Sequence, residues 1–281
     1  MSVLDVRPSP IAGTWYPGEP RRLAQNIADF IAAAELPPLP GSVVGVIAPH
    51  AGYRYSGATA GYAFRALQGS AWERVVVLSP FHGYTPAAVL TSSHRAYATP
   101  LGEIPLDAGA LEELTAALQR NGGPRLTPIA NDAEHGLEIE LPFLQVALDT
   151  PFSLLPLMVR ERDPQQLQRL GQALAAVLRE RPALIVASTD LSHFYTLQQA
   201  ETLDAEMLRQ FVAFSPLGAL QADETGTGFA CGISAVAAAL WACQGMGADR
   251  VVTLHHSTSA EQTGDTSRVV GYGAAAILKT E

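Results

Sequence analysis

Residues that can bind a metal ion or transfer a proton directly follow three apolar runs of this sequence. They are His50 after VIAP, His82 after VVVLSPF, and Asp190 after ALIVAST, with His193 three residues beyond Asp190. A single histidine at the end of a strand is commonly a hydrogen-bonded loop residue. Several such groups, each following its own strand, are better explained by one shared site at one edge of a sheet.

Cys231 is a further candidate for that site. It lies in GTGFACGISAVAAALWA (226–242), where a glycine-rich turn leads into an alanine-rich segment, so we expect it near the N-terminus of a helix. The helix dipole and the free N–H groups there should favour a thiolate and lower the pKa of the cysteine. Imidazole and thiolate together suit Fe(II), copper or zinc, whereas magnesium and calcium prefer oxygen ligands.

The roles of Asp190 and His193 stay open at this stage. Spacing alone is compatible with a metal ligand, with a side chain that supports a ligand, and with an acid–base pair. His135, in NDAEHGLEIELPF, is also ambiguous. It shares a helical face with Glu138 at i, i+3 spacing, which suits a capping position on the surface as well as a place at the rim of a pocket.

The other histidines are weaker candidates. We expect His94, in TSSHRAY, to be a solvated loop residue. His255 and His256 are neighbours on a predicted strand, so their side chains should point to opposite faces and cannot both join one site.

The elements that must position these residues alternate between strands and helices. Continuous apolar runs indicate strands buried on both faces, and they occupy 43–48, 74–79, 152–159, 183–188, 251–256 and 268–277. Helical periodicity is found at about 19–34, 57–67, 107–120, 163–180 and 197–214. This alternation predicts an α/β fold in which helices flank a central, mostly parallel or mixed sheet, as a single domain over residues 1–281.

Composition excludes several classes of function. The formal net charge of the 281 residues is −9 with no basic stripe, which argues against nucleic acid and against an anionic membrane surface. No window approaches the ~18 apolar residues of a membrane span. Two cysteines and no signal-like N-terminus predict a soluble, cytoplasmic protein. The P-loop, HExxH, CxxC and GxSxG motifs are all absent from the sequence.

The chain resembles the Memo family, whose bacterial and archaeal members are also called AmmeMemoRadiSam system protein B. Seven blocks carry the resemblance in order: GTWYPG (13–18), PHAGYRYSG (49–57), SPFHGY (79–84), EHGLEIELPF (134–143), STDLSHF (188–194), ACG (230–232) and TGDTSRVVGYGA (263–274). The family name refers to an association with an AMMECR-type protein and a radical SAM protein, which are therefore candidate partners.

The resemblance implies a fold shared with class III extradiol dioxygenases, which hold Fe(II) with two histidines and a glutamate. In the Memo pattern the two histidines match His50 and His82, and the third ligand position falls on Cys231. A thiolate is softer than a carboxylate and can itself be oxidised, so ring cleavage does not simply carry over, and copper or zinc competes with iron.

The same pattern places Asp190 and His193 in the pocket. If the protein is a metal-dependent enzyme, we expect His193 to be the acid–base group and Asp190 to orient it. It also implies that Trp15 and Tyr16 line the mouth. We expect a set of four residues to contact a substrate: Trp15, Tyr16, Tyr53 and His135.

Three functions compete on these grounds. The first is an iron-dependent oxidoreductase acting on a small molecule, which oxygen-dependent turnover would favour. The second is a binding module that holds a peptide or partner protein in the same pocket, using the aromatic residues Trp15, Tyr16, Tyr53 and Tyr55. Unchanged partner binding by the metal-free protein would favour it. The third is a metal-assisted hydrolase.

Overall fold

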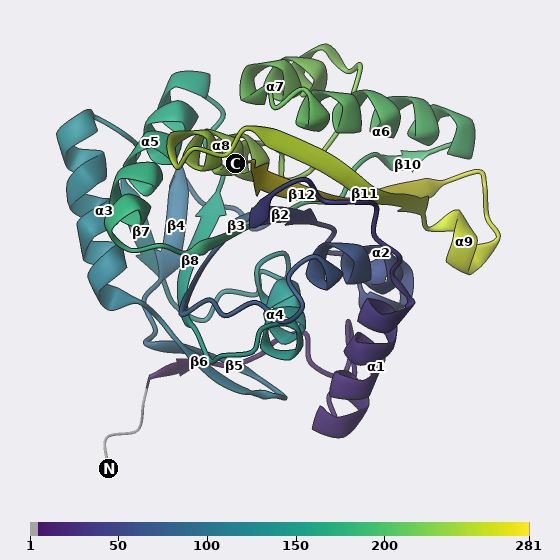
Figure 1. Ribbon diagram of the computed structural model, residues 1–281, viewed down its shortest axis with the longest axis horizontal. Helices are drawn as coiled ribbons and strands as arrows, with labels where there is room; N and C mark the ends of the chain where they lie inside the picture. Colours follow the sequence, from purple (N-terminus) through teal and green to yellow (C-terminus); the bar gives the residue numbers. More distant parts are fainter. Residues whose placement is uncertain (1–4, 281) are drawn as a thin grey trace.

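A mixed sheet of nine strands forms the centre of the protein (Figure 1). The computed structural model describes residues 5–280. The elements in chain order are β1 (Val6–Arg7), α1 (Pro20–Ala33), β2 (Ser42–Ala48), α2 (Tyr53–Arg65), β3 (Arg74–Pro80), β4 (Val89–Ser92), β5 (Ala96–Thr99), β6 (Gly102–Pro105), α3 (Ala108–Asn121), β7 (Leu126–Ile129), the short 3-10 helix η1 (Glu138–Glu140), α4 (Leu141–Ala147), β8 (Ser153–Val159), α5 (Pro164–Glu180), β9 (Leu184–Ser188), β10 (His193–Tyr195), α6 (Leu197–Val212), α7 (Pro216–Thr225), α8 (Ile233–Gly245), β11 (Arg250–Thr258), α9 (Ala260–Thr263) and β12 (Val269–Lys279).

Four parallel strands make up the middle of this sheet, in the order β2-β9-β3-β8. Antiparallel pairing extends it on both sides. β12 joins β2 and also pairs with β10 and β11, while β4 joins β8 and is followed by β7. The predicted α/β class with a mixed sheet is therefore confirmed. A second, three-stranded sheet has the order β1-β5-β6.

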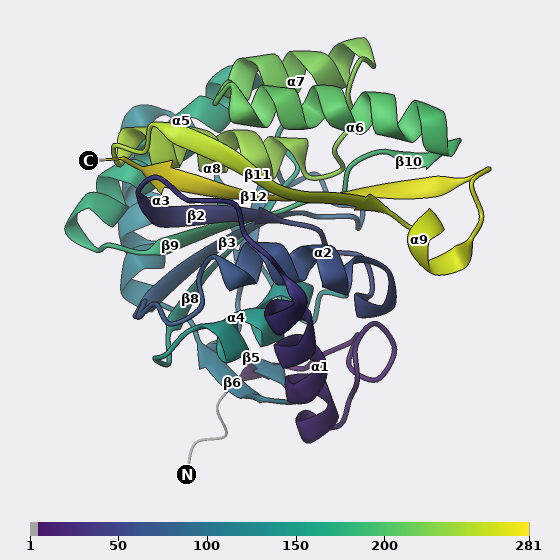
Figure 2. The same cartoon turned by 45° about the vertical axis from the view of Figure 1, so that its right-hand side comes forward.

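Helices cover both faces of the central sheet (Figure 2). Because side chains alternate along a strand, Ile47 packs toward α3, α5 and α8, whereas its neighbours Val46 and Ala48 pack toward α1, α2 and α4. Burial of both faces explains why the central strands read as unbroken apolar runs instead of alternating ones. Within residues 5–280, no helix has the length and hydrophobicity needed to cross a membrane.

Three helices begin at a polar residue followed directly by proline. The side chains of Glu19, Asp163 and Ser215 accept hydrogen bonds from backbone N–H groups in the first turn of α1, α5 and α7. Proline suits the first helical position because its missing N–H would have no partner inside the helix. These pairs fix the helix starts close to where periodicity predicts them for α1 and α5.

The strands that precede the candidate site residues are adjacent in space. β9 lies between β2 and β3 and runs parallel to both, with Ala48 opposite Ser188 and Leu78 opposite Ala187. The chain leaves all three strands at the same edge of the sheet. The segments that carry His50, His82 and Asp190 therefore start side by side.

Candidate functional site

A cavity of about 650 Å³ lies at this edge of the sheet. Its lining includes the polar side chains of His50, His82, His135, Asp190 and His193. The lining also includes aromatic side chains and residues of the loop between α9 and β12: Trp15, Tyr55, Phe194, Tyr272, Asp265 and Arg268. The cavity thus combines titratable groups with a largely apolar wall, as small-molecule sites commonly do.

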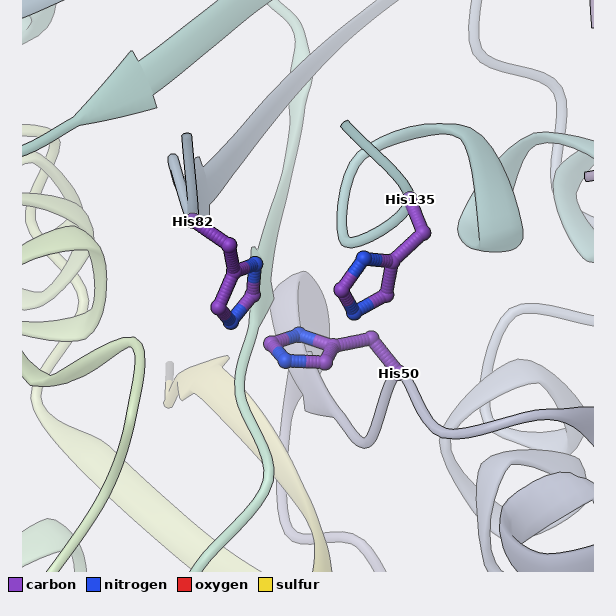
Figure 3. A group of neighbouring side chains, drawn as sticks. All are labelled: His50, His82 and His135. Atoms are coloured by element: carbon purple, nitrogen blue, oxygen red, sulfur yellow. The ribbon is translucent and has the colours of Figure 1, made fainter. Parts of the chain in front are cut away.

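Three of these imidazole rings, those of His50, His82 and His135, point toward one another (Figure 3). One nitrogen from each of His50, His82 and His135 lies within 4.8 Å of the other two. The ring of His50 stands at 85° to both others, with centroids 5.4 Å away, whereas the rings of His82 and His135 are stacked at 4.5 Å. A cluster of this kind can bind a transition metal, since neutral imidazole is the commonest protein ligand for such ions.

The orientation of His50 is fixed by a buried hydrogen-bond chain. Its Nδ1 lies 2.9 Å from Oγ of Ser188, which donates its one proton to an oxygen of Gly136 (2.5 Å) or of Glu140 (2.7 Å). Nδ1 of His50 is therefore the donor, and the lone pair is on Nε2, which lies 3.1 Å from Sγ of Cys231. Burial, followed by the charge of His82, lowers the pKa of His50 to about 3, so the ring is neutral at physiological pH.

His82 is oriented in the same way by a carboxylate. Its Nδ1 lies 2.9 Å from Oε1 of Glu134, which leaves Nε2 as the nitrogen without a hydrogen-bond partner among the described residues. A histidine held through Nδ1 by a carboxylate is the usual arrangement for a metal ligand, because the hydrogen bond fixes the tautomer and makes the ring more basic.

His135 lines the cavity, in line with the pocket alternative, and its ring also belongs to the histidine cluster, which the sequence did not indicate. It lies in the irregular segment between β7 and η1, where its ring packs against Trp15 with centroids 4.2 Å apart and planes tilted by 32°. Burial, followed by the charge of His50, lowers the pKa of His135 to about 4. The one feature of the sequence that could have indicated this position is that His135 follows Glu134, the carboxylate that bonds to His82.

Cys231 lies next to the three histidines but is not a member of that cluster. Its Sγ is 3.1 Å from Nε2 of His50 and accepts a hydrogen bond from the backbone N of Asp190 at 3.3 Å. It lies one residue before the N-cap of α8, Gly232, and so near the helix N-terminus, as the sequence predicts. The predicted fall in its pKa is wrong for this state of the protein, because burial and the charge of Asp190 raise the pKa of the thiol above its usual range.

Asp190 and His193 both line the cavity. Oδ1 of Asp190 accepts hydrogen bonds from the backbone N–H groups of His50 (2.7 Å) and Ala51 (3.3 Å), so this carboxylate connects the ends of β9 and β2. Burial raises the pKa of Asp190 to about 6. Nδ1 of His193 donates to the backbone oxygen of Leu191 at 2.8 Å, which leaves its Nε2 able to accept a proton.

The aromatic residues divide between the cavity and the core. Trp15 lines the cavity as expected, but Tyr16 and Tyr53 do not; each is only 3% exposed. The hydroxyl of Tyr16 donates to Glu138 (2.8 Å), and that of Tyr53 donates to the backbone oxygen of Ile139 (2.9 Å). The expectation that they contact a substrate is therefore corrected. Tyr55 takes their place on the wall, because α2 begins at Tyr53 and turns Tyr55 outward.

The remaining histidines lie outside the cavity wall. His94 is buried, not solvated as predicted: its Nδ1 lies 2.7 Å from Asp5, and its Nε2 accepts from the backbone of Asn131. His255 stacks on Tyr62 and His256 bonds to Asp204, on opposite faces of β11 as expected.

Comparison with known proteins gives consistent matches over nearly the full chain. The family model described as "Memo-like protein" matches residues 7–276. A MEMO1 family protein of Methanopyrus kandleri is 34% identical, over 94% of this chain and 96% of its own length. A MEMO1 family protein of Nitrosopumilus maritimus is 30% identical, over 96% and 98%. A third, of Methanothermobacter thermautotrophicus, is 33% identical, over 95% and 98%.

Proposed function

This chain belongs to the Memo family, and we propose that it is a metal-dependent oxidoreductase that acts on a small molecule bound in the cavity. Its metal is Fe(II) in this proposal, with copper and zinc as competitors, and its ligands are His50, His82 and Cys231. The observation that carries the proposal is the pair of hydrogen bonds at Nδ1 of His50 and of His82, because both leave Nε2 as the nitrogen that can bind an ion, and the side chain beside Nε2 of His50 is that of the third proposed ligand, Cys231.

The rival for the third ligand position is His135. Its ring is stacked on that of His82, with centroids 4.5 Å and planes 18° apart. An imidazole binds a metal through a lone pair in the plane of its ring, so an ion in the plane of one stacked ring lies outside the plane of the other.

The geometry of Cys231 suits the third position better. Its Sγ is 3.1 Å from Nε2 of His50. Two ligands bonded at about 2.0–2.3 Å to one ion stand roughly 3.5 Å apart. We therefore assign Cys231 to the metal and leave His135, which is neutral, to contact the substrate. Two imidazoles and one thiolate form a donor set that Fe(II), copper and zinc accept and that magnesium does not.

Proton transfer falls to His193 in this proposal, and Asp190 positions the site through the backbone of His50 and not, as expected, through a hydrogen bond to the ring of His193. A redox-active ion held by His50, His82 and Cys231 would supply electron transfer with the substrate. Nε2 of His193 is free to accept a proton from a substrate hydroxyl, since Nδ1 donates to Leu191. Asp190, by accepting from the backbone of His50, holds the two strand ends at a constant separation.

Metal analysis of protein purified without oxygen tests this function directly. We expect close to one iron per chain, lost in His50→Ala and in His82→Ala while both variants stay folded. Oxygen consumption is then screened with small phenols and diols. Full metal occupancy in either variant would remove that residue from the ligand set, and turnover that does not depend on metal would contradict the oxidoreductase.

A second candidate function is a binding module for a peptide or partner protein. Trp15 and Tyr55 line the cavity and are 36% and 39% exposed, which suits recognition of an apolar side chain. AMMECR-type and radical SAM proteins are the first partners to test. Equal partner binding by metal-free and metal-loaded protein, without oxygen-dependent turnover, would favour this function.

A further inference from the structure

Phe194 combines three features that are unusual for a phenylalanine. It follows His193 in β10, and the pairing of β10 with β12 shifts register between His193 and Tyr195, so Phe194 is the extra residue of a bulge. Its φ angle is +64°, in the left-handed region. Its side chain is 61% exposed although it lines the cavity.

A positive φ and an exposed aromatic ring both reduce the stability of the fold, so a functional role is the better explanation for them. A bulky residue with positive φ is a genuine outlier, and such conformations cluster at functional sites. Backbone hydrogen bonds enforce this one, since Leu191 N donates to Gly271 O (2.8 Å) and Gly271 N donates to Ser192 O (2.8 Å). A bulge next to an active site commonly redirects a side chain. Here it directs the ring of Phe194 over the cavity instead of into the core.

Arg268 meets that ring from the loop before β12. The carbon at the centre of its guanidinium lies 5.2 Å from the centroid of Phe194, within the range of a cation–π contact. Across residues 5–280, Arg268 forms no ion pair with a carboxylate. Nearby Asp265 also lines the cavity, but its Oδ1 accepts from N (2.8 Å) and Oγ (2.6 Å) of Ser267 in its own turn.

We propose that Phe194 and Arg268 bind the outer part of the ligand, and that this ligand is a small planar anion: a flat unsaturated ring that stacks on Phe194 and carries a carboxylate that pairs with Arg268. The two side chains act together because the cation–π contact holds the guanidinium beside the ring, and a guanidinium binds a carboxylate through two parallel hydrogen bonds. This inference deepens the proposed function, since it uses the same cavity.

Three commercial probes separate the two parts of the proposal. Benzoate is flat and anionic, benzamide is flat and neutral, and cyclohexanecarboxylate is anionic but not flat. Ligand-observed NMR titration of metal-free, EDTA-treated protein gives their dissociation constants without a contribution from a bound ion. We expect benzoate to bind at least ~10-fold more tightly than benzamide, since hydrogen bonds to a charged group are the strong ones. Cyclohexanecarboxylate should bind more weakly than benzoate.

Substitutions of Arg268 and Phe194 test which side chain is responsible for the preference for benzoate over benzamide. Arg268→Gln should weaken benzoate about 10-fold and leave benzamide unchanged. Phe194→Asn, in which asparagine tolerates the positive φ, should weaken benzoate and benzamide alike. Arg250→Gln, an exposed change at the start of β11, is the matched control and should behave as wild type.

Several results would overturn the inference. They are benzamide binding within about threefold of benzoate, no measurable benzoate binding, or Arg268→Gln with wild-type discrimination. Unchanged binding in Phe194→Asn would remove the stacking surface. Because the assay contains no metal, it is independent of the metal proposal: a protein that binds no iron but still discriminates through Arg268 contradicts the oxidoreductase and supports this inference.

Discussion

Nδ1 of His82 lies 2.9 Å from Oε1 of Glu134, and Oε2 of the same carboxylate accepts a hydrogen bond from the backbone N of His82 at 2.6 Å. The backbone N of Gly136 also donates to Oε1, at 2.7 Å. Burial opposes ionisation of Glu134, but the bonds and charge of His82, with the bond from Gly136, lower its pKa to about 2. One ionised side chain therefore fixes both the ring and the backbone of His82.

Glu134→Gln should weaken metal binding while keeping the fold. Both oxygens of Glu134 accept from N–H donors, so the amide NH₂ of glutamine must face a donor and lose a hydrogen bond. Loss of such a supporting partner typically costs about 10–100-fold in metal affinity. Competition with a chelator measures this change. Glu112→Gln, at an exposed position in α3, is the control and should bind metal as tightly as wild type. Equal metal affinities in the two variants would show that Glu134 does not support His82 as a ligand.

Comparison of Cys231→Ala with His135→Ala tests the third ligand. Removal of the thiolate should reduce affinity for Cu(I) and zinc by at least ~100-fold, because these ions prefer sulfur, whereas removal of His135 should change it less than ~10-fold. Anaerobic competition titrations give both values. Cys243→Ala, in the buried face of α8, controls for the loss of a cysteine. A larger loss of metal affinity in His135→Ala than in Cys231→Ala would show that His135 is the third metal ligand.

The site residues that follow regular strands could be predicted from the sequence with a role in a shared site, whereas Glu134, in an irregular segment, could not, and the place of His135 in the histidine cluster could not either. His50, His82 and Asp190 could be found because unbroken apolar runs mark β2, β3 and β9, and parallel strands end at one edge of a sheet. Glu134 and His135 lie in the segment between β7 and η1, whose path has no periodicity to indicate it.

Contacts with a distant part of the chain determine the path of that segment. Nε of Arg7 bonds to Asp132, 125 residues away, and its NH groups reach Glu138 and the backbone oxygen of Glu134. A pairing across such a separation leaves no local pattern in the sequence. Tyr16 was misassigned for a related reason: it adjoins Trp15 in sequence, but its hydroxyl bonds to Glu138 in the core.

Arg7→Met should destabilise the protein strongly. Arg7 is 1% exposed and forms ion pairs of 2.8 Å with Asp132 and 2.6 Å with Glu138. Methionine fills similar volume but leaves two buried carboxylates without their cation, which typically costs about 3–5 kcal/mol. Urea unfolding measures the loss. Arg22→Met, exposed in α1, should lie within ~0.5 kcal/mol of wild type. A similarly small effect in Arg7→Met would show that the carboxylates find other partners.

The turn that carries Asp190 and His193 depends on close packing between Gly271 and Asp204. A Cβ atom added to Gly271 would lie 1.9 Å from Oδ2 of Asp204, which is fully buried. Asp204 accepts hydrogen bonds from the backbone N of Ser192 (2.9 Å) and from Nε2 of His256 (2.8 Å), so it cannot move aside without breaking them.

Substitutions at these two positions should therefore be strongly non-additive. Gly271→Ala should cost about 1–3 kcal/mol of unfolding free energy through overpacking. Asp204→Ala should cost about 1–3 kcal/mol because Ser192 N and His256 lose their acceptor. The double variant removes the clash, so its loss should fall short of the sum by roughly 0.5–3 kcal/mol. Gly109→Ala, whose added Cβ would have its nearest neighbour at 3.6 Å, is the control and should be neutral or stabilising. Additive losses in the urea-unfolding cycle would mean that the turn accommodates a methyl group without displacing Asp204.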